Sequence, residues 1–212
     1  MRLVCIHGIG VTSAYFAPLV RELERRHEVA APDLPGWGSG PKPRHVLDLQ
    51  ELAESLVPLL PAAVVANSLG CQVAVELAIA HPEVVPSLVL IGPTVDPHTS
   101  LPVGFVRDSA YEPPSLWWLI ARDYARMGVR RFVRTAQFAL RQPLAQRLPL
   151  VQAPALVLRG ARDGIVSRRW CTEVAGLLPR GRFVQLARGA HAVHYTDPAL
   201  VAEEIEQHLG ER

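Results

Sequence analysis

The sequence predicts an α/β fold built on a parallel sheet, and three observations support that prediction. Short apolar stretches rich in β-branched residues recur along the 212 residues, and they lack the strict alternation of half-exposed strands. Amphipathic helical patterns lie between these stretches. Strands that are buried on both faces and alternate with helices are typical of parallel sheets. The length suits a single domain with one core.

Six stretches are predicted to be strands, beginning with RLVCI at residues 2–6 and EVAAP at residues 28–32. The others are AAVVA at 62–66, SLVLIG at 87–92, ALVLRG at 155–160 and RFVQLA at 182–187. Helices are predicted over residues 14–26, 48–59, 70–80, 168–178 and 198–209. Taken in chain order, these elements predict strands that run in one direction and are joined by crossovers.

One interval departs from this alternation. Between Pro93 and Pro154 no strand is visible, and a proline-rich loop is expected to lead into helices at residues 115–127 and 129–141. Their apolar faces are expected to consist of Leu116, Ile120, Tyr124 and Met127 in the first and Val129, Phe132, Val133, Ala136 and Leu140 in the second. We expect a core of residues 1–95 and 151–212, with a helical cap of residues 96–150 over the C-terminal ends of the strands, where sites in open α/β sheets form.

Composition and charge limit the possible functions. The net charge of +2 gives no reason to expect a nucleic-acid partner. Cys5, Cys71 and Cys171 lie far apart without CxxC or Cys/His spacing, so they are expected to be buried thiols, with no disulfide framework and no metal site. No apolar run reaches transmembrane length, and the N-terminal stretch is too short for a signal peptide. We expect a cytoplasmic protein without a membrane partner.

The stretch AVVANSLGCQVA at residues 63–74 places a serine between a predicted strand and a predicted helix. In that context the pattern G-x-S-x-G forms a nucleophile elbow, whose sharp turn requires small residues two positions before and two after the serine. Ala66 and Gly70 meet that requirement around Ser68. The sequence leaves two interpretations open: Ser68 is a nucleophile, or its side chain caps the helix that follows.

A nucleophilic serine needs a histidine to take its proton and a carboxylate to orient that histidine. In folds with such an elbow, the acid and then the histidine follow the serine, each at the end of a strand. Asp163 follows the predicted strand at 155–160, and His191 follows the one at 182–187. The presence of both residues, in this order, favours the nucleophile interpretation and a Ser-His-Asp triad.

The first predicted strand ends in His7-Gly8-Ile9-Gly10. If this strand lies beside the elbow strand, the N–H groups of Ile9 and Leu69 face one pocket and form an oxyanion hole for a substrate carbonyl. The alternative is that the two glycines only permit a tight turn.

Together these motifs resemble the α/β-hydrolase fold family, in its branch of Ser-His-Asp esterases and hydrolases of meta-cleavage products. The resemblance extends over HGIG at residues 7–10, PDLPGWGSG at 32–40, ANSLG at 66–70, HPEVVPSLVLIGP at 81–93, GARDGIVS at 160–167 and GAHAVHYTDP at 189–198. It implies Ser68 as nucleophile, His191 as base and Asp163 as acid, and it implies that the loop from Leu34 to Trp37 borders the pocket.

The chain departs from the family pattern at its N-terminus. Family members have two further strands before the strand that leads to the oxyanion loop, whereas this sequence starts at that strand. We therefore expect about six strands, all parallel, with residues 28–32 at one edge of the sheet. Glu28 and Pro32 are residues that discourage pairing at an exposed edge.

Three further residues compete for roles in the site. Asp96 follows the predicted strand at 87–92, a position from which some relatives draw the acid, so it is the second choice for that role. His194 lies three residues beyond His191, but the spacing from His191 to Pro198 fits the family better. His7 is expected to brace the oxyanion loop rather than to take a proton.

The expected activity is cleavage of a carboxylic ester, thioester or lactone through an acyl-enzyme, without metal or organic cofactor. Two alternatives stay open: a carbon–carbon bond hydrolase of the meta-cleavage-product type, which Asn67 beside the serine resembles, and a relative that binds ligands without turnover. The expected partner is a small substrate with an apolar acyl or aromatic part, and the chain is expected to be a monomer or homodimer.

Residues 96–150 are expected to decide specificity. Gly8, Trp37, Trp117 and Trp118 are the predicted substrate contacts, and Phe105, Phe132 and Phe138 are further aromatic residues of the cap. The same interval holds eight arginines against four acids. These arginines either attract an anionic substrate or an acidic carrier protein, or they only solvate the outer faces of the helices.

Overall fold

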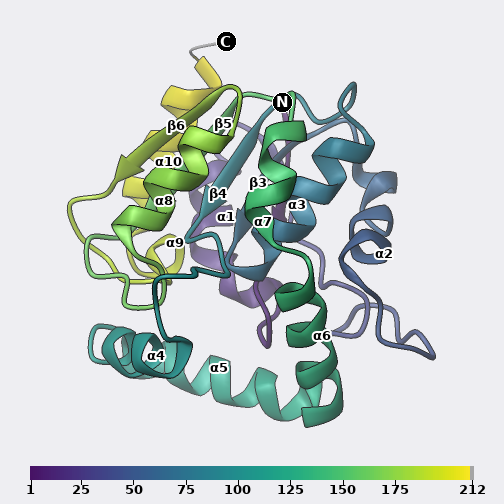
Figure 1. Ribbon diagram of the computed structural model, residues 1–212, viewed down its shortest axis with the longest axis vertical. Helices are drawn as coiled ribbons and strands as arrows, with labels where there is room; N and C mark the ends of the chain where they lie inside the picture. The colour runs from purple at the N-terminus through teal and green to yellow at the C-terminus, as the bar shows by residue number, and fades with distance from the viewer. Residues whose placement is uncertain (211–212) are drawn as a thin grey trace.

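A computed structural model describes residues 1–210 as one six-stranded sheet in the order β2-β1-β3-β4-β5-β6, with every neighbouring pair parallel (Figure 1). The strands are β1 (Arg2–Ile6), β2 (Glu28–Ala30), β3 (Ala63–Asn67), β4 (Leu88–Ile91), β5 (Ala155–Arg159) and β6 (Gly181–Gln185). The six predicted strands and the edge position of residues 28–32 are confirmed. Residues 211 and 212 of the expected core lie outside the described residues.

Helices cover both faces of the sheet. On one face lie α2 (Leu49–Glu54), α3 (Leu69–Ala80) and α8 (Arg168–Leu177), and on the other lie α1 (Ala17–Leu23) and α10 (Pro198–Gly210). Successive side chains of a strand point to opposite faces of the sheet. Val4 and Ile6 pack on the face covered by α2, α3 and α8, and Leu3 and Cys5 pack on the face covered by α1 and α10. This two-sided burial explains why the strands lack an alternating pattern. A short helix, α9 (Val193–Thr196), precedes α10.

Two predicted helices are shorter than expected. The pattern at residues 14–26 divides into a 3-10 turn, Ser13–Tyr15, and α1. The pattern at 48–59 gives α2, which Asp48 and Glu51 close with a capping box, and then a separate 3-10 turn, Val57–Leu59. Pro58 lacks the N–H that a continuing helix would use, so the helix ends before it.

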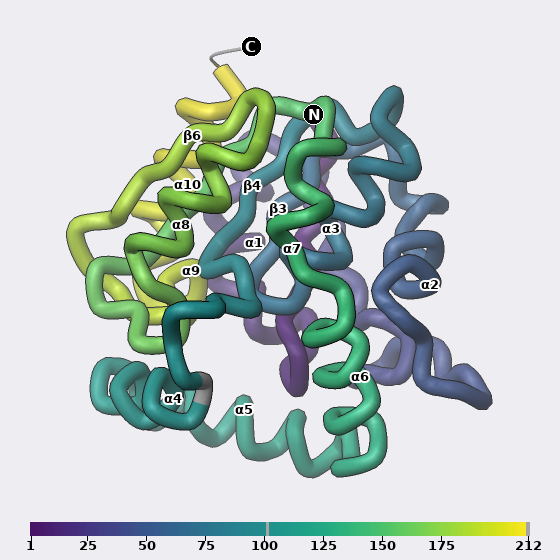
Figure 2. The backbone as a smooth tube through the Cα atoms, in the orientation of Figure 1, coloured from purple at the N-terminus to yellow at the C-terminus, as the bar shows by residue number. Residues whose placement is uncertain are grey.

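Within residues 96–150, three helices form a layer beyond the C-terminal ends of the strands, as the ribbon and the tube both show (Figures 1 and 2): α4 (Leu101–Ser109), α5 (Pro114–Met127) and α6 (Val129–Arg141). The chain then returns to the core through α7 (Leu144–Arg147), which packs against α3, and a 3-10 turn, Leu148–Leu150. The expectation of a loop before α5 was wrong for α4. Pro102 lies in the first turn of that helix, where proline costs no hydrogen bond.

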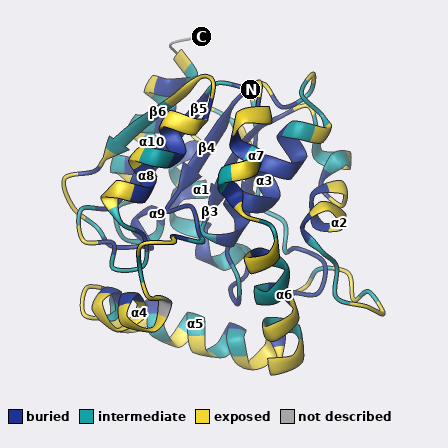
Figure 3. Cartoon of the chain, viewed as in Figure 1, coloured by how far each residue is buried: buried dark blue, intermediate teal, exposed yellow. Residues whose placement is uncertain are grey.

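The apolar face expected for α6 was also partly wrong. Val129 is 80% exposed and Val133 is 43% exposed, whereas Phe132 and Ala136 line an internal cavity. Figure 3 shows exposed residues along much of α4, α5 and α6. An apolar pattern with a period of 3.6 residues identifies the apolar face of a helix, but it does not predict which residues of that face are buried by the rest of the protein.

Two findings bear on the expectations from composition. Cys5, Cys71 and Cys171 are all buried and free. None of the helices within residues 1–210 combines the length and the apolarity that crossing a bilayer would require.

Candidate active site

Ser68 occupies a sharp turn between β3 and α3. Its φ of 57° and ψ of −124° lie in a region that residues other than glycine rarely adopt. Among residues 1–210, Ser68 is the one non-glycine residue with positive φ. Its side chain makes no capping hydrogen bond to α3, so the capping interpretation was wrong. Gly70 lies against the backbone carbonyl of Ile6, where a Cβ would collide. The small residue after the serine is therefore required by close packing on β1.

His191 and Asp163 meet at the same end of the sheet. His191 Nδ1 lies 3.0 Å from Asp163 Oδ2, and both side chains are buried. The other carboxylate oxygen of Asp163 accepts hydrogen bonds from the N–H groups of Ile165 (2.9 Å) and Val166 (2.8 Å). The carboxylate is thus held on one side by the backbone and faces the imidazole with the other.

Burial and the neighbouring charges shift the pKa of His191 in opposite directions. Burial of the ring lowers this pKa, but the charge and hydrogen bond of Asp163, with the charges of Asp108 and Glu112, raise it above the ordinary value for histidine. The imidazolium form is therefore stabilised in this site. An imidazole that must accept a proton in the first step of a reaction and hold it as a cation is helped by such an environment.

Two carboxylates that the sequence did not predict hold the backbone around His191. Asp108 Oδ1, on α4, accepts hydrogen bonds from the N–H groups of His191 (2.9 Å) and Gly164 (3.1 Å). Glu112 Oε1, just after α4, accepts from the N–H of Ala192 (3.0 Å). The helical layer and the two loops that carry the imidazole and the carboxylate are therefore tied together.

This contact depends on glycine in α4. A Cβ on Gly104 would lie 2.6 Å from the carbonyl oxygen of Gly164, so a larger residue would push the helix away. Burial raises the pKa of both carboxyls, that of Glu112 to about 7. One feature of the sequence could have indicated that Asp108 and Glu112 contact the histidine loop. They are two acids four residues apart in an interval whose other charged residues are mostly arginines.

Ile9 and Leu69 follow β1 and β3, and these two strands are neighbours in the sheet. β1 pairs with β3 through Ile6 and Ala66, and both Ile9 and Leu69 line the same cavity as Ser68. Leu69 is the first residue of α3, so its N–H belongs to the positive end of the helix dipole. A developing negative charge at this point would be favoured.

His7 fixes the loop that carries Ile9. Its Nε2 accepts a hydrogen bond from the N–H of Leu34 (3.0 Å), so the proton is on Nδ1, which donates to the carbonyl of Gly8 (2.8 Å). Burial lowers the pKa of His7, which keeps the ring neutral. A protonated ring would lose the bond to Leu34, and this arrangement agrees with a bracing role.

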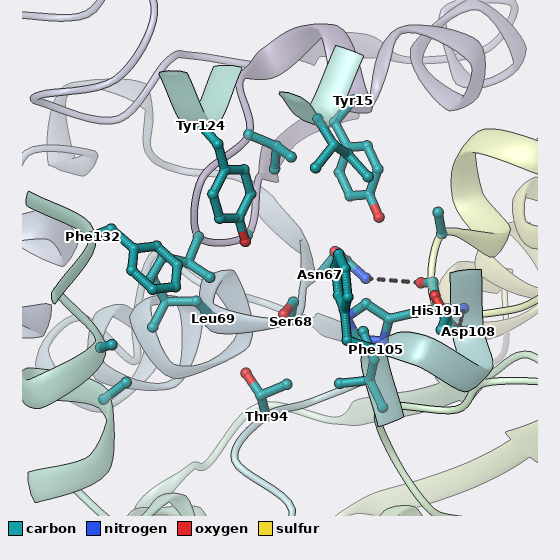
Figure 4. Close-up of a pocket in the computed structure, with 18 of the residues that line it drawn as sticks. Tyr15, Asn67, Ser68, Leu69, Thr94, Phe105, Asp108, Tyr124, Phe132 and His191 are labelled. Atoms are coloured by element: carbon teal, nitrogen blue, oxygen red, sulfur yellow. Dashed lines mark hydrogen bonds between the residues drawn. The ribbon is translucent and has the colours of Figure 1, made fainter. Parts of the chain in front are cut away.

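Asn67 joins the elbow to the histidine loop. Its Nδ2 donates to the carbonyl oxygens of Ile91 (3.1 Å) and His191 (3.3 Å), and the second bond is the dashed line in Figure 4. The amide therefore has a structural task beside the serine.

Ser68 and His191 face one cavity of about 270 Å³. Figure 4 shows Tyr15 and Tyr124 with their hydroxyl groups directed into it, and Thr94 on its opposite side. Most of the wall is apolar and comes from the loop after β1 and from α4, α5 and α6, through residues such as Ile9, Phe105, Leu116, Ile120, Phe132 and Leu140. In the described part of the chain Ser68 Oγ makes no hydrogen bond, a state that is common for catalytic serines before substrate binds.

The four predicted substrate contacts divide into two pairs. Gly8 and Trp117 line the cavity. Trp37 does not: it is buried beside His7, with 5.9 Å between the ring centroids, and the Leu34 to Trp37 loop supports His7 instead of bordering the cavity. Trp118 is 76% exposed, because neighbouring residues of a helix point about 100° apart and Trp117 already faces inward.

The rival acid is engaged elsewhere. Asp96 accepts hydrogen bonds from the N–H groups of His98 (2.7 Å) and Ser167 (2.7 Å) and from the hydroxyl of Thr99 (2.9 Å). These bonds anchor the start of the helical layer to the residue that caps α8. In this structure His191 is paired with Asp163 and not with Asp96.

The rival base is fully buried behind the site. His194 packs between Tyr15 and Phe16, with ring centroids 4.5 Å away in each case, and neither of its ring nitrogens has a hydrogen-bond partner among residues 1–210. Burial, and then the neighbouring charge of His191, lower the pKa of His194 to about 3. A ring that stays neutral and unpaired is poorly suited to accept a proton in catalysis.

This burial predicts an acid-sensitive fold. The unfolded chain takes up a proton at His194 below about pH 6.5, and the folded chain does so only near its lowered pKa, so stability is full above pH 6.5 and is lost as the pH falls toward 3. We expect His194→Phe to reduce the loss of unfolding free energy between pH 7 and pH 5 by about 2 kcal/mol. Urea unfolding at the two pH values measures this. His45→Asn, at an exposed histidine, is the control, and an equal loss in the His194 variant and the unchanged chain would contradict the prediction.

Comparison with known proteins decides the family. A sequence model of the alpha/beta hydrolase family matches residues 3–204. The chain belongs to this family. The predicted resemblance is thereby confirmed, as is the six-stranded parallel form of the fold.

Curated relatives of this hydrolase include enzymes that act on different substrates. It is 28% identical over 92% of its length to a putative carbamate hydrolase, RutD, of Pseudomonas savastanoi pv. phaseolicola, and covers 88% of that protein. It is 27% identical over 98% of its length to a pimeloyl-[acyl-carrier protein] methyl ester esterase of Aeromonas hydrophila, and covers 95% of it. Relatives of this kind support a hydrolase, and they differ in the bond that is cleaved.

Solved structures agree on the fold. The enol-lactonase from Burkholderia xenovorans LB400 superposes with a TM-score of 0.83 at 17% identity, over 99% of this hydrolase and 91% of the lactonase. The esterase from Exiguobacterium antarcticum gives 0.83 at 16% identity, over 99% of this chain and 92% of that one.

Proposed function

We propose that this hydrolase cleaves a carboxylic ester through an acyl-enzyme, with Ser68 as nucleophile, His191 as base and Asp163 as the acid that orients it. One observation carries the proposal: a strained serine at the start of α3 shares a cavity with an imidazole whose Nδ1 is held by a buried carboxylate. The competing candidates for the acid and the base do not contact this site in the same way. Asp96 accepts a hydrogen bond from the N–H of Ser167, and the buried ring nitrogens of His194 have no hydrogen-bond partner among residues 1–210.

The proposed reaction has two halves. Ser68 Oγ attacks the ester carbonyl while His191 Nε2 takes its proton, and the N–H groups of Ile9 and Leu69 bind the resulting oxyanion. The tetrahedral intermediate collapses, His191 gives the proton to the departing alkoxide, and the acyl group stays on Ser68. Water then attacks the acyl carbonyl with His191 again as base, and the acid leaves as the proton returns to Ser68. The proposal includes the formation of a hydrogen bond from Ser68 Oγ to His191 Nε2 when substrate binds.

The helical layer of residues 96–150 is proposed to act as a cap that selects the substrate. Phe105, Leu116 and Phe132 give the cavity an apolar wall, which favours an apolar acyl or aromatic part in the substrate. The cap also supplies Asp108 and Glu112, which hold the backbone of the histidine loop.

A substrate panel tests the proposal. We expect hydrolysis of p-nitrophenyl esters from acetate to decanoate, with kcat/KM rising to a maximum at the acyl length that fills the cavity, and labelling by a fluorophosphonate. A ring-cleavage product of the meta type is assayed beside the esters. Faster turnover of that compound than of every ester would favour the carbon–carbon hydrolase. Absence of both labelling and turnover would favour a non-catalytic binding protein.

The proposal makes a prediction for the pH profile. The charge of Asp108 raises the pKa of His191, so Asp108→Asn is expected to lower that pKa and to shift the acid limb of kcat/KM to lower pH, because a neutral imidazole then persists at lower pH. An asparagine oxygen still accepts from the N–H groups of His191 and Gly164. A pH series from 5 to 9 measures the shift. Glu83→Gln, at an exposed site, is the control, and a limb that stays in place or moves to higher pH would contradict the prediction.

A further inference from the structure

Exposed apolar side chains are concentrated on the helical layer. Of the eleven large apolar side chains that are exposed in the described part of the chain, nine lie between residues 96 and 150. They include Val103 and Val106 on α4, Trp118 on α5, and Val129, Val133 and Leu140 on α6. Isolated exposed apolar residues are ordinary, but a gathering of this kind on one layer marks an interaction surface.

The spacing of these residues places them in one stripe on each helix. On α5, the exposed residues Trp118, Ala121 and Ala125 follow one another at intervals of three and four. On α6, Val129, Val133 and Leu140 lie at intervals of four and seven. The α5 stripe lies away from the cavity. The α6 stripe lies on the same side of its helix as Ala136, and it reaches the cavity at Leu140.

All four acids of the layer are turned inward. Asp96, Asp108, Glu112 and Asp123 are at most 9% exposed. Asp96, Asp108 and Glu112 accept hydrogen bonds from backbone N–H groups, and Asp123 bonds to Thr12 and pairs with Arg122. The acids therefore contribute little to the charge that the outer surface presents.

Five of the eight arginines in residues 96–150 are exposed. Five exposed arginines of the layer have no acidic partner within residues 1–210: Arg107, Arg126, Arg130, Arg134 and Arg141. Arg126, Arg130 and Arg134 are spaced four residues apart along the end of α5 and the first turns of α6, beside the apolar stripes. The outer surface thus combines apolar and cationic side chains, and none of the layer's acids is exposed on it.

Two exposed apolar residues of these helices also reach the cavity. Phe105 and Leu140 both line the cavity and are 44% and 60% exposed. An apolar molecule could pass from the outer surface into the cavity along apolar side chains.

We propose that the outer surface of α4, α5 and α6 binds the surface of an anionic phospholipid bilayer. Tryptophan and aliphatic side chains enter the boundary between headgroups and acyl chains, and arginines near anionic headgroups add electrostatic attraction. An acidic protein would match the charge of the arginines, but it would not account for the exposed apolar stripes beside them. Binding of this kind requires no membrane-spanning helix, and it revises the expectation that the protein has no membrane partner.

Sedimentation with vesicles tests this proposal independently of any activity. At 0.1 M salt we expect the full chain to sediment with vesicles of phosphatidylcholine and phosphatidylglycerol, and at least tenfold less with phosphatidylcholine alone. The triple variants Trp118→Ser/Val129→Ser/Val133→Ser and Arg126→Gln/Arg130→Gln/Arg134→Gln are each expected to lose at least tenfold in binding. The matched control is Leu177→Ser/Arg180→Gln, which changes an exposed apolar residue and an exposed arginine outside the layer, and is expected to bind as the unchanged chain does. Circular dichroism verifies that each variant is folded.

Three results would overturn the proposal. The first is a chain that stays in the supernatant with the anionic vesicles. The second is equal binding to polyglutamate with no loss in the apolar triple variant, which would indicate an acidic protein. The third is a dimer in sedimentation equilibrium that the apolar triple variant abolishes, which would assign the surface to a second copy of the chain.

Discussion

Ser68→Ala is expected to reduce kcat/KM for ester hydrolysis by about 10⁴-fold or more, because no other group in the cavity can form the acyl-enzyme. The cavity's other hydroxyls, on Tyr15, Tyr124 and Thr94, do not lie at the start of a helix beside the Leu69 N–H. Fluorophosphonate labelling is expected to disappear in the same variant. Initial rates with the best p-nitrophenyl ester measure the loss.

A matched serine controls this experiment. Ser55 is exposed on the far end of α2, where its hydroxyl bonds only to the carbonyl of Leu52. Ser55→Ala is expected to keep full activity and labelling. Turnover and labelling that survive in Ser68→Ala would remove Ser68 from the mechanism and, with it, the proposed function.

Asp163→Asn is expected to lower kcat by about 10⁴-fold without unfolding the protein. The oxygen of asparagine would continue to accept from the N–H groups of Ile165 and Val166, which leaves its NH₂ group facing His191 Nδ1. His191 would then carry its proton on Nε2, and that tautomer cannot take a proton from Ser68. The loss therefore comes from the wrong tautomer and not from lost packing.

The control for this variant is the rival acid. Asp96→Asn is expected to retain activity in its folded fraction, because Asp96 bonds to His98, Thr99 and Ser167 and not to the imidazole. Circular dichroism and kcat are measured for both variants. A large fall in kcat for Asp96→Asn, with Asp163→Asn nearly unchanged, would reverse the assignment of the acid.

The losses of activity caused by Ser68→Ala and Asp163→Asn are not expected to be additive. Once Ser68 is absent, the tautomer of His191 no longer matters to acyl transfer, so the double variant Ser68→Ala/Asp163→Asn should be no slower than Ser68→Ala alone. A further loss in the double variant would mean that Asp163 has a second role, for example in holding the loop of Ile165.

The sequence by itself determined the parts of this protein whose physics is local. The strands are visible because burial on both faces demands short continuous apolar runs, and the turn at Ser68 is visible because a sharp backbone turn demands small neighbours. The order of Ser68, Asp163 and His191 along the chain could be used because parallel strands bring their C-terminal ends to one edge.

Only the tertiary structure decided which side of each helix in residues 96–150 is covered. Trp117 faces the cavity and Trp118 faces outward, and Val133 is exposed although it belongs to an apolar pattern. Asp108 and Glu112 became parts of the site because residues about eighty positions later in the chain present N–H groups to them. Hydropathy along a helix depends on neighbouring residues, whereas burial and hydrogen-bond partners depend on distant segments that folding brings into contact.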